Sequence, residues 1–124
     1  MDDQQSNTSL VAGSKVSGTS VYNPSGQSIG SIWDIMIDKR SGKVAYAIMS
    51  FGGFMGIGED YHPLPWSTLK YNTTLGGYVV DVSIEQLKNG PSYARDMDPG
   101  WGDPAYETKL HDFYGVGPYW GSMA

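Results

Sequence analysis

The sequence contains no cysteine, which excludes a disulfide framework, a thiol nucleophile and a cysteine-ligated metal. It also has few basic residues: eight Lys and Arg against thirteen Asp and Glu give a formal net charge of −5. Because binding to phosphates needs clustered Lys and Arg, we do not expect nucleic acid as a partner. No apolar run is long enough to span a membrane, and residues 1–9 lack the features of a signal peptide. We therefore expect no membrane insertion, a flexible N-terminus over 1–9 and a cytoplasmic location.

The residues that are abundant point to one small all-β domain. A length of 124 residues suits a single domain, and a hydrophobic content of 40% is enough for a buried core. The chain has 17 Gly and 7 Pro, which favour many turns and short strands over long helices.

The most regular pattern lies between residues 27 and 51. Ile35 and Ile37 fall on one strand face, but Ile29 does not keep that phase, so we expect a β-bulge between Gly30 and Asp34. Residues 39–42 read as a hairpin loop. The return strand is apolar on both faces, which predicts a central strand of the sheet.

Shorter signals flank this hairpin. The segment 13–23 reads as a strand or bent strand pair, and 23–26 reads as a turn. Two prolines within 62–72 suit an edge strand or an extended bridge, and 78–82 reads as a short strand. Ser83 and Gln86 fit a capping box that opens a short helix ending near Gly90. Nine residues on these segments are expected to share one core: Ile29, Ile35, Ile37, Val44, Tyr46, Ile48, Leu69, Val80 and Val82.

Three stretches together resemble the PRC-barrel family: IGSIWDIMIDKRSGKVAYAIMSFGG, GIGEDYHPLPWSTL and YVVDVSIEQLKNGPSY. The family includes the cytoplasmic domain of the photosynthetic reaction-centre H subunit and the C-terminal domain of a ribosome-maturation factor. The resemblance implies a strongly bent, SH3-like barrel of about six strands over residues 10–93, with one short helix after the last strand. It is similar to stand-alone bacterial members, and it implies docking to larger assemblies without a catalytic residue set.

Residues 94–124 form a Gly- and Pro-rich tail that we expect to be irregular and to pack on a barrel. From Tyr93 onward the chain has seven of its sixteen aromatic residues, whereas disordered tails are usually poor in aromatics. Large rings dominate protein interfaces because they remove much area from water at little entropic cost. We expect Trp101, Tyr114, Tyr119 and Trp120 to be the interface anchors of a homodimer.

Sites for metals, cofactors and catalysis are not expected. The Gly-rich stretch 52–58 lacks the spacing of a nucleotide loop and reads as a turn. Among Glu59, Asp60 and His62, strand alternation sends Glu59 to the opposite side from the other two. Asp34 and Asp38 stand four residues apart, about 13 Å along a strand, which is too far for paired carboxylate catalysis.

The leading functional hypothesis is a non-catalytic protein-binding or assembly module that forms a homodimer or joins a larger assembly. The alternative hypothesis is a barrel that binds a small ligand under the aromatic tail. An enzyme with an unrecognised site is the third and least favoured hypothesis, since the chain has two histidines and no nucleophile motif.

Overall fold

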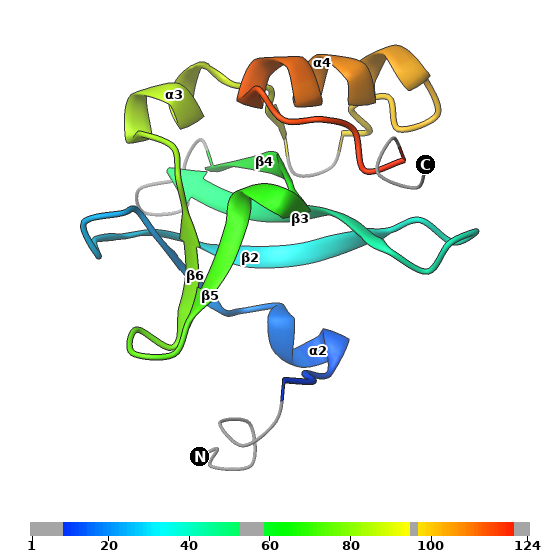
Figure 1. The fold of residues 1–124 in the computed structure, drawn as a ribbon. Coiled ribbons are helices and arrows are strands. Elements are labelled where there is room, and N and C mark those ends of the chain that lie inside the picture. The colour runs from blue at the N-terminus through cyan, green and yellow to red at the C-terminus, as the bar shows by residue number, and fades with distance from the viewer. Residues whose placement is uncertain (1–8, 53–58, 95–96, 121–124) are drawn as a thin grey trace.

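The computed structural model describes residues 9–52, 59–94 and 97–120 (Figure 1). Their strands form one seven-stranded sheet with the order β5-β6-β1-β2-β3-β4-β7. Neighbouring strands are antiparallel, except that β1 and β6 are parallel. The bounds are β1 Ser20–Tyr22, β2 Ser28–Ile37, β3 Val44–Gly52, β4 Glu59–Pro65, β5 Leu69–Asn72, β6 Gly77–Val80 and β7 Tyr93–Ala94. The predicted all-β class is thus confirmed, although β5 and β7 end the order and the sheet is not closed into a barrel.

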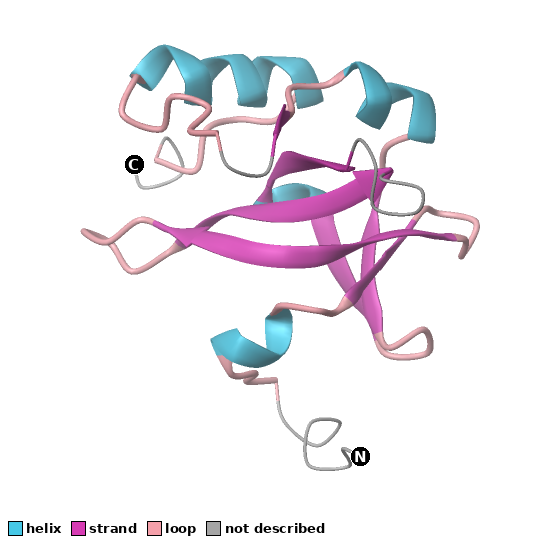
Figure 2. Ribbon diagram, turned by 180° about the vertical axis from the view of Figure 1, so that it is seen from behind, coloured by secondary structure: helices cyan, strands magenta, loops and turns pink. Residues whose placement is uncertain are grey.

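Short helices cover the two sides of this bent sheet. They are α2 Gly13–Val16, α3 Ile84–Asn89, α4 Pro104–Tyr114 and the 3-10 turn η2 Trp66–Thr68. Figures 1 and 2 show α3 and α4 side by side above β3 and β4, with α2 on the opposite side of β2. No helix in the described ranges is long and apolar enough to cross a membrane.

The β2–β3 hairpin has the irregularities that its sequence predicts. The register between the two strands shifts between Ile32 and Asp34, which leaves Trp33 as the extra residue of a bulge. Gly30 lies against the neighbouring strand, where a Cβ would collide with the carbonyl oxygen of Ser50. The bulge prediction is therefore confirmed.

Asp38 organises the hairpin loop. Its carboxylate accepts hydrogen bonds from the Arg40 backbone N–H and the Ser41 hydroxyl, both at 3.0 Å. These bonds favour the ionised form, the first more than the second, and hold the pKa of Asp38 below its ordinary value. Gly42 completes the turn with φ of 77°, a left-handed conformation that favours glycine.

Strand β3 is buried on both faces, as expected for a central strand. Ala45, Ala47 and Met49 lie on one face, and Tyr46 and Ile48 on the other; each is at most 4% exposed. Of the nine predicted core residues, Ile29, Tyr46, Ile48, Leu69, Val80 and Val82 are buried. Ile35 packs against the core from a half-buried position, and Val44 is half-buried.

Ile37 was expected in the core, and that prediction is wrong: its side chain is 54% exposed. It pairs with Val44 at the outer end of the hairpin, which extends beyond the packed layers in Figure 1. Ile37 does lie on the predicted strand. Its side chain is exposed because this end of the hairpin lies away from the core.

Two further expectations need correction. The start of the segment 13–23 is not a strand: Gly13–Val16 is a helical turn that buries Val16, and β1 begins only at Ser20. The tail is also not irregular throughout, because α4 spans eleven residues. Proline at the first helical position is compatible with a helix, since its missing N–H would have no intrahelical partner there.

Candidate functional site

Helix α4 lies over β4 and brings the tail onto the Tyr46 face of the sheet (Figure 1). The Asp103 side chain caps its N-terminus by accepting from the Ala105 N–H at 3.0 Å. Gly115, with φ of 68°, ends it in the left-handed region. Leu110 is fully buried and Tyr114 is 8% exposed, and both belong to the same hydrophobic cluster as the strands. The tail is therefore part of the folded domain.

The Tyr46 hydroxyl is the polar centre of this contact. It donates to Glu107 Oε1 at 2.8 Å and lies 2.9 Å from His111 Nε2. A tyrosine hydroxyl has one proton, which here goes to Glu107, so its oxygen accepts from the Nε2–H of His111. Glu107 and His111 stand four residues apart on α4, which places both side chains on one helix face.

Six rings surround this centre, and we call them the tail cluster: Tyr46, Trp101, Tyr106, His111, Tyr119 and Trp120. The Tyr46 ring centroid lies 5.3 Å from that of Trp101 and 5.9 Å from that of Tyr119. Trp120 contacts the His111 ring edge-on at 5.3 Å. Such tilted and edge-to-face pairs are the favoured aromatic geometries.

Burial shifts the proton affinities of the cluster away from neutral pH. It is the main cause that raises the pKa of Tyr46 far above its ordinary value, and the hydrogen bond to Glu107 adds to it. Burial likewise raises the pKa of Tyr106 to about 12. It lowers the pKa of His111, although the backbone of Gly117 and the charge of Glu107 act in the opposite direction. At neutral pH the cluster is thus a fixed hydrogen-bonded contact that holds the tail.

A second group of rings, which we call the strand cluster, comprises Trp33, Tyr61 and Tyr93. Trp33 stacks on Tyr61 with centroids 4.3 Å apart, and Tyr93 meets Tyr61 edge-on at 5.7 Å. Tyr61 pairs with Ser50, which alternation places on the same face of β3 as Tyr46. Both clusters therefore lie on one face of the sheet, about 13 Å apart along β3.

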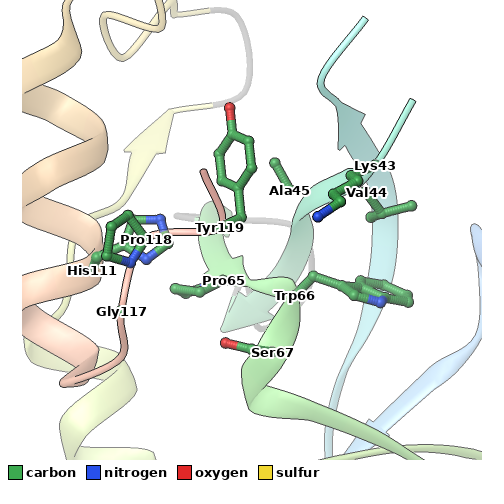
Figure 3. Close-up of a pocket in the computed structure, with 10 residues that line it drawn as sticks. All are labelled: Lys43, Val44, Ala45, Pro65, Trp66, Ser67, His111, Gly117, Pro118 and Tyr119. Atoms are coloured by element: carbon green, nitrogen blue, oxygen red, sulfur yellow. The ribbon is translucent and has the colours of Figure 1, made fainter. Parts of the chain in front are cut away.

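A pocket of about 250 Å³ opens beside the tail cluster. Figure 3 shows Lys43, Val44 and Trp66 on one side of it, and His111, Gly117 and Pro118 on the other. The start of β3, the end of β4 with η2, and the segment after α4 thus each contribute to its wall.

The predicted interface anchors occupy different environments. Tyr114 is buried against α3, where a Cβ on Gly90 would lie 2.7 Å from its hydroxyl oxygen. Trp101 and Tyr119 are half-buried in the tail cluster, and Trp120 remains 43% exposed. The structure thus brings Trp101, Tyr119 and Trp120 together around Tyr46, and it places Tyr114 apart from them.

Glu107 and His111 were not recognised from the sequence, although their spacing on a capped helix was a signal that could have found them.

The residues considered for metal binding, Glu59, Asp60 and His62, all lie on β4. His62 is only 5% exposed, and burial lowers its pKa. Asp60 is half-buried on the same strand, the side chain of Glu59 lies outside the described residues, and so does most of the Gly-rich stretch, 53–58. Within the described ranges, no group of three or more His, Asp and Glu side chains is placed to hold a metal ion.

The PRC-barrel domain family model matches residues 9–87. This range is more than half of the 124-residue chain and runs from the segment before α2 into α3. No curated protein matches the chain significantly. Helix α4 and the tail side chains around Tyr46 lie outside the matched range.

Proposed function

The chain belongs to the PRC-barrel domain family, and from this premise we propose that it is a non-catalytic assembly module that forms a homodimer. The observation that carries the proposal is a pair of exposed tryptophans on one face of the sheet. Trp33 is 48% and Trp120 is 43% exposed. Large exposed apolar side chains gathered on one face are typical of interaction surfaces.

Each of these tryptophans packs against a buried ring. Trp33 stacks on Tyr61, which is 2% exposed, and Trp120 packs on His111, which is 4% exposed. Rings fixed in this way lose little conformational freedom on binding, which is the property of interface hot spots.

The surface area that the two tryptophans can bury supplies part of a dimer interface. Burying the exposed halves of Trp33 and Trp120 removes about 100 Å² from water for each ring. A stable interface buries about 1,000 Å² or more in total, so the hairpin and tail must supply the remainder. In a C₂ dimer every contact occurs twice, which doubles the contribution of each ring.

The proposal extends to a further protein partner in a larger assembly, and it includes neither nucleic acid nor membrane, given a net charge of −5. It also includes a cytoplasmic location, for which the absence of cysteine is the support. The non-catalytic role is supported by a sequence with two histidines and no nucleophile motif.

The test is sedimentation equilibrium of the full chain and of Trp33→Ser and Trp120→Ser variants. Each substitution should weaken dimerisation by about tenfold or more, which corresponds to about 1.4 kcal/mol. Tyr71→Ser is the matched control, because Tyr71 is 54% exposed but lies on β5 at the other end of the strand order. If neither Trp33→Ser nor Trp120→Ser weakens dimerisation relative to the Tyr71→Ser control, this face is not the interface.

Point substitutions are preferable to truncation after Tyr93. Removal of α4 would expose Tyr46 and delete Leu110 from the core, so a truncated chain would report on folding as well as on association.

A further inference from the structure

We propose that the pocket beside the tail cluster binds a small aromatic carboxylate. This inference concerns a ligand and is independent of the proposed dimer. The pocket lies between the segment 117–119 and the β3–β4 pair, so a ligand there would contact both the tail and the sheet (Figure 3).

The walls favour a flat apolar body. Two proline rings, Pro65 and Pro118, and the aromatic ring of Tyr119 line the space, and Trp66 contributes from η2. These side chains are rigid and are held by their neighbours: Trp66 packs on Tyr78 at 5.4 Å, and Tyr119 on Tyr46 at 5.9 Å. Small-molecule sites have this character, with mostly apolar walls and a few polar groups that orient the ligand.

The size of the pocket limits the ligand to one or two fused rings with a short substituent. Its volume is about 250 Å³, whereas an apolar cavity of about 150 Å³ already accepts benzene. Sites for drug-sized molecules begin at about 300 Å³. A single indole or benzene ring with one acidic group fits between these limits.

The charge of the ligand follows from the polar groups at the edge. Lys43 is exposed, and Figure 3 shows its nitrogen directed toward the space between Tyr119 and Pro65. Within the described part of the chain, the ammonium of Lys43 makes no ion pair or side-chain hydrogen bond. A carboxylate placed there would receive a charge-assisted hydrogen bond from Lys43.

The opposite side of the pocket disfavours a second negative charge. Glu107 raises the pKa of Tyr119, after the larger effect of burial. Asp38 acts on Tyr119 in the same direction, but it lies on the hairpin beside Lys43, where its N–H donates to the Lys43 carbonyl oxygen at 2.8 Å. An anion next to Tyr119 would be repelled by these carboxylates. The site therefore orients a monoanionic ligand, with its ring toward Tyr119 and Pro118 and its carboxylate toward Lys43.

The experiment is a titration of the ¹⁵N-labelled full chain with indole-3-acetate and, separately, with the neutral indole-3-acetamide, followed by amide chemical shifts. We expect saturable shifts at Lys43, Ser67 and Gly117, with the acetate bound about tenfold more tightly than the acetamide. Lys43→Met should remove that preference. Lys39→Met is the matched control, because Lys39 is an exposed lysine of the same hairpin that does not line the pocket.

Three results would overturn the proposal. The first is the absence of any saturable chemical shift at millimolar ligand. The second is equal affinity for the acetate and the acetamide. The third is an equal loss of affinity for the acetate in the Lys43→Met and Lys39→Met variants. The last result would show that the ligand responds to the overall charge of the hairpin and not to a site.

Discussion

Replacement of Tyr46 by Phe removes one buried hydroxyl and leaves the ring in place. Tyr46 is 1% exposed, and its hydroxyl bonds both Glu107 and His111. A hydrogen bond to a charged group is worth about 1.5–3 kcal/mol, and a buried donor left without a partner costs about 1–3 kcal/mol. Glu107 is half-buried and can recover water, whereas the His111 ring is buried. We therefore expect a loss of about 2–3 kcal/mol in the free energy of unfolding.

Urea unfolding followed by tryptophan fluorescence measures this loss. With a slope of about 2 kcal/mol per molar urea, the midpoint should fall by about 1 M. Tyr71→Phe is the control, because that ring is 54% exposed, and its change should stay within about 0.5 kcal/mol. A loss below about 0.5 kcal/mol for Tyr46→Phe would refute the hydrogen-bonded contact between the tail and the sheet.

Three further predictions concern pH, packing and metals. Burial lowers the pKa of His62 and His111 despite nearby Asp60, Glu107 and Asp112, so the unfolded chain binds more protons below about pH 6.5. Stability should therefore be constant near pH 7.5 and fall toward pH 5, and urea midpoints that rise instead would contradict this. Ile48→Ala should cost about 2–4 kcal/mol and Ile37→Ala less than about 1 kcal/mol; equal losses by thermal unfolding would contradict the assigned burial. EDTA should leave the melting temperature unchanged, and a drop restored by one specific ion would reveal a metal site.

Local chemistry accounts for the parts of the fold that could be predicted. The bulge at Trp33 follows from a break in apolar phase, and the Ser83 cap follows from a side chain that accepts from the Gln86 N–H at 3.0 Å. Both signals lie within a few residues, where backbone geometry and side-chain hydrogen bonds decide the outcome.

The parts that could not be predicted depend on contacts between distant segments. The parallel pairing of β1 with β6 joins Val21 to Tyr78, and no local pattern encodes that partner. The tail helix has local signals in Asp103 and Gly115, but the prolines around it favour turns over a long helix. The aromatic content of the tail predicted that it would be buried, yet the partner of its polar side chains, Tyr46, lies 61 residues before Glu107.

The most direct test of the assembly proposal is the mass of the unmodified full chain in solution. Light scattering across a series from low to high micromolar concentration should give about twice the chain mass of 13.5 kDa at the upper end. The mass should return toward one chain on dilution. A mass of one chain throughout the series would contradict the proposal that Trp33 and Trp120 form a homodimer interface.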